Sequence, residues 1–339
     1  NNISWGSVSG AAGGVTCSAT NNTYAGDDAA NSITTAAADN TGFGYRTLYS
    51  LTSGDCNVAV GSCALYATTT AVYNTAVGAC AMLTATTGQV NTGVGFNVLR
   101  NLTTGERNTA IGVRALCGNT TGGKNTGSGV YALYYNTTGS CNTASGYLSL
   151  CANTTGQYNT AVGARALEKN STASYNAAVG VNALQANTTG AANTATGYNA
   201  LVVNTTGACN TVTGSAAMMC NTTGSANTAM GRLALSTNTT ASYNTAVGYQ
   251  SLYATTTGGC NTAVGRAALT ANTTGTSNTA AGDRALTANT TGQRNTVSGY
   301  RAGKANTTGG MNTVMGTRSL YNNTTGSLNS AFGDWAMRG

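Results

Sequence analysis

Residues 261–277 read NTAVGRAALTANTTGTS, and this unit decides the fold. From Asn40 the same pattern recurs every 17 residues, without insertion or deletion, as far as the unit that starts at Asn329. Numbered from its first Asn, the consensus is N-T-A-V-G-x-x-A-L-x-x-N-T-T-G-x-x, with Asn at position 1 and Gly at position 5 in every unit. A fixed period of this kind indicates a repeat architecture in which each unit contacts its neighbours.

The residues of the unit favour strands and turns over helices. Gly at position 5, Gly at most copies of position 15 and Thr at positions 2, 13 and 14 all lower helix propensity. Two packed helices rarely fit in fewer than about 30 residues. We therefore predict an all-β protein, a parallel β-solenoid of about 20 coils, with equal positions stacked roughly 4.8 Å apart over on the order of 90 Å.

The array is expected to fill the chain. Residues 40–339 form the regular part, and residues 1–39 are interpreted as irregular opening coils, a cap or junction, because Asn2 and Asn22 keep the N-x-x-x-G frame. The first residue is not Met, which favours a mature or partial chain. No apolar run is long enough for a membrane span.

The distribution of charge predicts which positions face outward. Within the regular array Lys, Arg, Asp and Glu occur only at positions 6, 7, 10, 11, 16 and 17. We expect positions 7 and 10 to be exposed, and the apolar residues at positions 4 and 9 to form the core. The Asn of position 1 is expected to form an internal ladder, because its amide both donates and accepts, and Gly at position 5 to turn the corner after the strand.

The residue inventory argues against catalysis and cofactors. The chain has no His, so it lacks a Ser-His or Cys-His pair, and its 8 acidic residues are scattered along the outward columns. Cys without His at irregular spacing is a poor metal site. The net charge of +7 is spread along the array, which does not favour a nucleic-acid partner. We expect no enzyme activity, no cofactor and no metal.

The N-T-T or N-S-T triplet at position 12 is an acceptor sequence for N-glycosylation. The alternative is a polar turn with a stacked Thr ladder. The candidate acceptors, including the triplet at Asn101, are Asn101, Asn119, Asn136, Asn153, Asn170, Asn187, Asn204, Asn221, Asn238, Asn272, Asn289, Asn306 and Asn323. The position-1 Asn never starts such a triplet in the regular units.

The 10 Cys residues suggest an oxidising, extracellular setting. Cys63 and Cys80 share position 7 in adjacent coils, which makes them the best candidates for a disulfide. Free thiols and bridges between chains are the alternatives. The only two Trp residues, Trp5 and Trp335, fall in the first and last coils. They are candidates for an assembly junction, or each covers its own end of the array.

The run Asn244-Thr245-Ala246-Val247-Gly248-Tyr249-Gln250-Ser251-Leu252-Tyr253 and its copies resemble repeats of phage tail-fibre and bacterial surface-fibre proteins. They are more distantly similar to the N-S-x-A-I-G repeats of trimeric autotransporter adhesin heads. The resemblance implies a structural subunit of an extracellular, cell-surface or virion fibre that self-assembles into a filament or homo-oligomer. One alternative is an adhesin that binds cell-surface glycans through its Tyr and Arg columns. Another is an ice-binding solenoid with Thr rows at positions 13 and 14.

Overall fold

The computed structural model describes residues 16–17 and 20–337, and its chain divides into two compact units, Asn1–Arg165 and Ala166–Gly339. The described residues form short strands and turns and contain no helix. Both units are parallel β-solenoids with a 17-residue repeat, as the sequence predicts.

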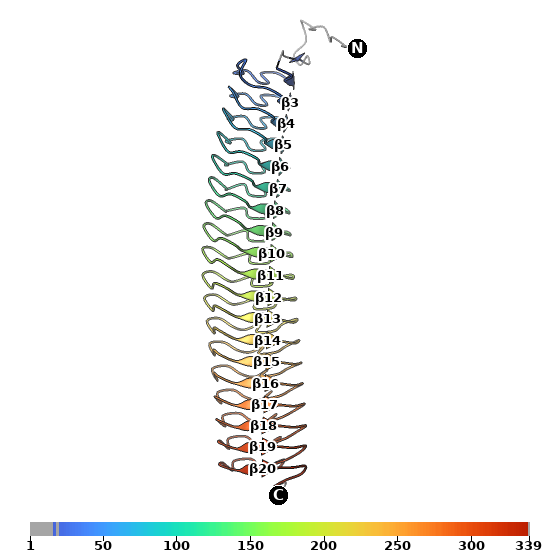
Figure 1. The fold of residues 1–339 in the computed structure, drawn as a ribbon, viewed down its shortest axis with the longest axis vertical. Helices are drawn as coiled ribbons and strands as arrows, with labels where there is room; N and C mark the ends of the chain where they lie inside the picture. Colours follow the sequence, from blue (N-terminus) through green and yellow to red (C-terminus); the bar gives the residue numbers. More distant parts are fainter. Residues whose placement is uncertain (1–15, 18–19, 338–339) are drawn as a thin grey trace. The chain divides into compact units, whose positions relative to one another are not determined.

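The described residues of the first unit form ten strands. From β2 to β10 each strand pairs in parallel with the next, whereas β1 pairs antiparallel with β2. Figure 1 shows β3 to β10 stacked in chain order. The ten strands are β1 (Thr16–Cys17), β2 (Thr23–Ala25), β3 (Thr41–Phe43), β4 (Val58–Val60), β5 (Thr75–Val77), β6 (Thr92–Val94), β7 (Thr109–Ile111), β8 (Thr126–Ser128), β9 (Thr143–Ser145) and β10 (Thr160–Val162).

The second unit repeats the arrangement. Each of its strands pairs in parallel with the next at a register shift of one repeat, for example Thr211 with Thr228. The strands are β11 (Ala177–Val179), β12 (Thr194–Thr196), β13 (Thr211–Thr213), β14 (Thr228–Met230), β15 (Thr245–Val247), β16 (Thr262–Val264), β17 (Thr279–Ala281), β18 (Thr296–Ser298), β19 (Thr313–Met315) and β20 (Ser330–Phe332).

The core differs from the prediction at position 4. Successive residues of a strand point to opposite faces, and in every three-residue strand the middle residue, position 3, is the buried one. Position 4 therefore faces outward, and Val264 is 44% exposed. The expectation of a buried position 4 was wrong. The core is instead formed by small residues at position 3 together with positions 8, 9 and 12.

Position 9 is buried as predicted, with Leu116, Leu167 and Leu269 fully inaccessible. Positions 7 and 10 are less exposed than expected. Arg114 and Arg301 are half-buried, and at position 10 Cys117 and Cys151 are buried. Access to solvent therefore varies among the side chains of positions 6 to 11: Cys117 is buried, whereas Tyr135 and Arg165 are exposed.

Positive backbone φ angles close each coil. Gly at position 5 has φ values such as +140° at Gly214, where a Cβ atom would lie 2.5 Å from the carbonyl oxygen of Gly231. Positions 7, 9 and 17 also adopt the left-handed region without being Gly, as at Arg114 (φ 56°) and Leu116 (φ 51°). This conformation costs roughly 1 kcal/mol or more for each such residue, so contacts between coils must offset it.

Candidate functional site

The Asn column at position 1 is internal, as predicted. Asn210 is fully buried, and its Oδ1 accepts from the backbone N–H of Asn227 at 3.0 Å and from Asn227 Nδ2 at 3.1 Å. Its Nδ2 donates to the carbonyl oxygen of Gly224 at 2.9 Å. The ladder begins at Asn22, whose Oδ1 accepts from the backbone N–H of Asn40. In both units the ladder joins the Asn side chains to backbone N–H and carbonyl groups.

The Asn column at position 12 is also internal, which the sequence did not suggest. Asn204 and Asn221 are fully buried, and Asn221 Nδ2 donates to Asn204 Oδ1 at 2.7 Å and to Gly224 O at 3.0 Å. A glycan would have to replace a hydrogen on this buried nitrogen. Glycosylation of position 12 therefore does not fit the folded coil, and the turn alternative explains the triplet better.

The accessible acceptor triplets lie elsewhere. Asn101 is exposed because it stands at position 11, one residue before the buried column. The triplet at Asn21, also exposed, and that at Asn322, which the sequence reading overlooked beside Asn323, have the same access. An N-x-T search in register with position 12 misses Asn322, since its own triplet begins one residue earlier.

The Thr columns at positions 13 and 14 are not equivalent. Thr205 at position 13 is half-buried, and its hydroxyl donates to the carbonyl oxygen of Thr222 in the next coil at 3.1 Å. Thr206 at position 14 is exposed. The two outward hydroxyl rows expected for an ice-binding face are thus reduced to one.

The cysteines proposed as a disulfide, Cys63 and Cys80, are both half-buried free thiols in the structure, so their pairing stays a prediction. Burial raises the pKa of the Cys117 thiol above its ordinary value, against the smaller opposing effects of Arg100 and Arg114. A raised pKa keeps this thiol protonated and unreactive.

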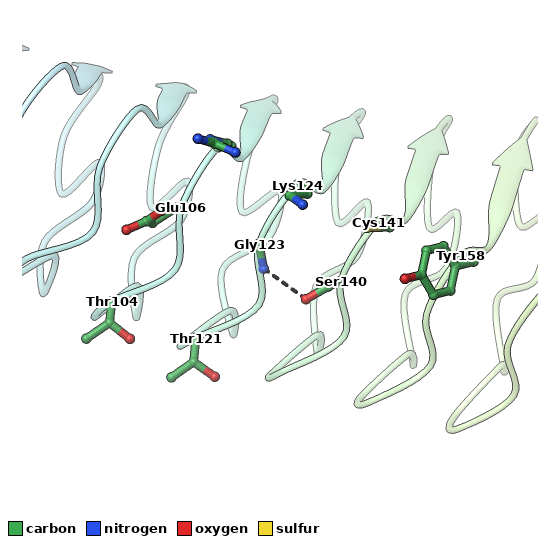
Figure 2. Close-up of a pocket in the computed structure, with 9 residues that line it drawn as sticks. Thr104, Glu106, Thr121, Gly123, Lys124, Ser140, Cys141 and Tyr158 are labelled. Atoms are coloured by element: carbon green, nitrogen blue, oxygen red, sulfur yellow. Dashed lines mark hydrogen bonds between the residues drawn. The ribbon is translucent and has the colours of Figure 1, made fainter.

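The first unit contains a shallow groove of about 430 Å³ (Figure 2). It runs between Thr104 and Thr121 on one side and Glu106 and Lys124 on the other. At its centre Gly123 has no side chain, and its N–H donates to Ser140 Oγ at 3.1 Å. A similar groove of about 270 Å³ lies beside Gly310 in the second unit. Both grooves arise because Gly occupies position 16, and neither assembles a catalytic pair.

Six charged and aromatic residues lie together near the end of the second unit, and we call them the arginine–aromatic cluster. Its members are Tyr300, Arg301, Lys304, Arg318, Tyr321 and Trp335. The Arg301 Cζ atom lies 5.0 Å from the ring centroid of Tyr300, and Arg318 Cζ lies 5.9 Å from the same ring. Arg318 Cζ also lies 4.6 Å from the ring of Trp335.

The two remaining members of the cluster, Lys304 and Tyr321, contact each other. Lys304 Nζ donates to Tyr321 Oη at 3.1 Å and lies 5.3 Å from that ring, which is 6.2 Å from the Trp335 ring. The hydrogen bond from Lys304 lowers the pKa of Tyr321, and the charges of Lys304, Arg301 and Arg318 act in the same direction. The cluster therefore presents a locally positive potential.

The two Trp residues were predicted as an assembly junction. Trp335 is half-buried and packs on Arg318 of its own chain, while Trp5 lies outside the described residues. The junction stays a prediction. In residues 16–17 and 20–337 no group of three His, Cys, Asp or Glu residues could hold a metal ion, and no helix could cross a membrane.

Comparisons with family models, with curated proteins and with solved structures found no match for this chain. The resemblance to phage and bacterial fibre repeats therefore stays a prediction. Any functional proposal rests on the coil chemistry itself.

Proposed function

We propose that the chain is a non-catalytic structural subunit of an extracellular, cell-surface or virion fibre. The observation that supports this most directly is the position-1 Asn ladder. In each unit it bonds one coil to the next through the same backbone N–H and carbonyl groups. Such stacking lets length grow by the addition of coils, each stabilised by its neighbours.

The outer face of the sheet supports assembly of copies of this chain into a filament or homo-oligomer. It presents Thr at position 2 and mostly apolar residues at position 4, such as Val264 and Met315, with no charged residue in either column of the regular array. Two copies with the same 17-residue register offer matching rows at the strand spacing of about 4.8 Å. An uncharged, apolar face of this kind favours a partner with an identical face.

The location on a fibre is tested by immunogold electron microscopy of the source cells or virions with antibodies raised against the purified chain. We expect gold along external fibres and none with pre-immune serum. Label confined to the cell interior would refute the fibre assignment.

Self-assembly is tested on the purified chain. Val264→Glu places a charge on the exposed sheet face, and Arg165→Glu changes an exposed residue on another column. We expect Val264→Glu alone to lower the mass measured by light scattering. Equal effects of the two substitutions would argue against this face.

A further inference from the structure

Within residues 20–337, no acidic side chain forms an ion pair with the three cations of the arginine–aromatic cluster. Arg301 and Arg318 stand at position 7 of successive coils, and Lys304 follows at position 10. The ion pairs of the described residues join Arg46 to Asp28 and Arg266 to Asp283, so none includes these three. The neighbouring acids do not compensate: Asp283 is held by Arg266 at 2.9 Å, and Asp334 is exposed without an ion pair.

The aromatic rings hold the two guanidinium groups in place. Both Arg301 and Arg318 lie within 6 Å of the Tyr300 ring centroid, the usual range of a cation–π contact. Their Nε atoms are buried and have no hydrogen-bond acceptor. The terminal nitrogens make no hydrogen bond to the described residues. A guanidinium stacked on a ring keeps its in-plane donors available for an oxyanion, and its loss of freedom on binding is small.

We propose that the arginine–aromatic cluster binds an acidic polysaccharide, with its carboxylate or sulfate groups on Arg301 and Arg318. Lys304 donates one proton to Tyr321 and retains two for the same ligand. Binding of a polysaccharide goes beyond the structural role, because residues near the end of the second unit then bind a soluble or surface-bound polymer.

The arrangement favours a polysaccharide over a nucleic acid. Arg301 and Arg318 occupy equivalent positions of adjacent coils, about 4.8 Å apart, so they can bind neighbouring acidic groups of one polymer. Tyr300 and Trp335 carry guanidinium groups against their rings, so they are not the free stacking platforms that single-stranded nucleic acids use.

The test is a titration of the full chain, with Trp5→Phe so that Trp335 is the remaining Trp residue and its fluorescence can be excited selectively. The probes are polygalacturonate, heparin oligosaccharides and a single-stranded DNA of equal charge. The test variant is Arg301→Gln/Arg318→Gln. The matched control is Arg114→Gln, since Arg114 contacts the Tyr131 ring at 6.0 Å but has no Arg at position 7 of the next coil.

We expect quenching of Trp335 by one or both polysaccharides and at least a tenfold weaker affinity in the double variant. The dependence of log affinity on log salt should become shallower by about one to two units. The carboxylated and sulfated probes identify which acidic group is preferred. The proposal is overturned by equal affinities of the double variant and the parent chain, by an equal loss in Arg114→Gln, or by tighter binding of DNA than of either polysaccharide. Unfolding curves of both variants show that the fold is retained.

Discussion

The Asn columns at positions 1 and 12 are both buried, but only the first is filled by Asn in every unit of the regular array. At position 12 the first coils carry Leu51, Thr68, Ala85 and Leu102 instead, all inaccessible to solvent. The hydrogen bonds explain the difference. Position 1 satisfies backbone groups of the neighbouring coils, whereas position 12 bonds mainly to side chains of its own column.

A shared acceptor makes position 12 replaceable. Gly224 O accepts from Asn210 Nδ2 of position 1 and also from Asn221 Nδ2 of position 12. If the position-12 Asn is replaced by an apolar residue, the carbonyl keeps one donor. By contrast, the backbone N–H that donates to the position-1 Oδ1 has no second acceptor. A buried, unpaired backbone group costs about 1–3 kcal/mol, which favours Asn at position 1.

The largest effect is expected from a charge within the position-12 column. Asn204→Asp replaces a donor by a carboxylate that faces Asn187 Oδ1 and Gly207 O, both acceptors. An unpaired buried charge should lower the free energy of unfolding by about 3–5 kcal/mol. Chemical denaturation measures this. Asn101→Asp, on the exposed position 11, is the control and should change stability by less than about 0.5 kcal/mol. Similar values for both variants would contradict the burial of the column.

A substitution at position 1 should have a smaller effect on stability than Asn204→Asp, and it tests the difference between the two columns. Asn244→Leu leaves the backbone N–H of Asn261 without its acceptor and removes the donor to Gly258 O, which has no Asn at position 12 beside it. We expect the free energy of unfolding, measured by chemical denaturation, to fall by about 3 kcal/mol.

The matched substitution is Asn238→Leu, six residues earlier at position 12. Asn238 Oδ1 already lacks a partner, and Ala241 O keeps the donor Asn227 Nδ2. The substitution leaves Asn221 Oδ1 without this donor, so its cost should be about 1–2 kcal/mol, below that of Asn244→Leu. If Asn238→Leu were as damaging as Asn244→Leu, the distinction between the columns would be lost.

The repeat period was sufficient to predict the solenoid, its register and the position-9 core, because one insertion-free pattern admits little else. It was not sufficient for the direction of each side chain. Val264 looked like core because it is apolar, yet strand alternation turns Ala263 inward and Val264 outward. Asn204 looked like an exposed turn residue because it is polar, yet the neighbouring coils satisfy its amide. Composition alone does not reveal such partners.

Repairing the interrupted column should stabilise the chain modestly. At Thr255 the position-12 ladder is broken: Thr255 Oγ1 and Asn238 Oδ1 are buried without a partner. Thr255→Asn would supply a donor to Asn238 and to Gly258 O, and should raise the free energy of unfolding by about 1–2 kcal/mol. Thr68→Asn is the control, because Thr68 Oγ1 already donates to Ala85 O at 3.0 Å and its column neighbours are apolar. Stabilisation by both substitutions, or by neither, would disagree with this account.

The smallest effect on stability is expected from changes to exposed Asn residues. Here the exposed and buried acceptor triplets are compared by whether a glycosylating enzyme can modify them. Secretion from a glycosylating host exposes every acceptor triplet to the same enzyme, but only exposed Asn residues can carry a sugar in the folded coil. We expect sugar on Asn21, Asn101 and Asn322, which are exposed, and none on Asn204 or Asn221, which are buried. Intact-mass measurement before and after enzymatic removal of N-linked sugar gives the number of sites, and glycopeptide mapping gives their positions. Asn101→Gln and Asn322→Gln should each remove one site without a measurable change in unfolding temperature. Sugar on Asn204 or Asn221 in material that unfolds cooperatively would show that the position-12 column is not the buried ladder described above.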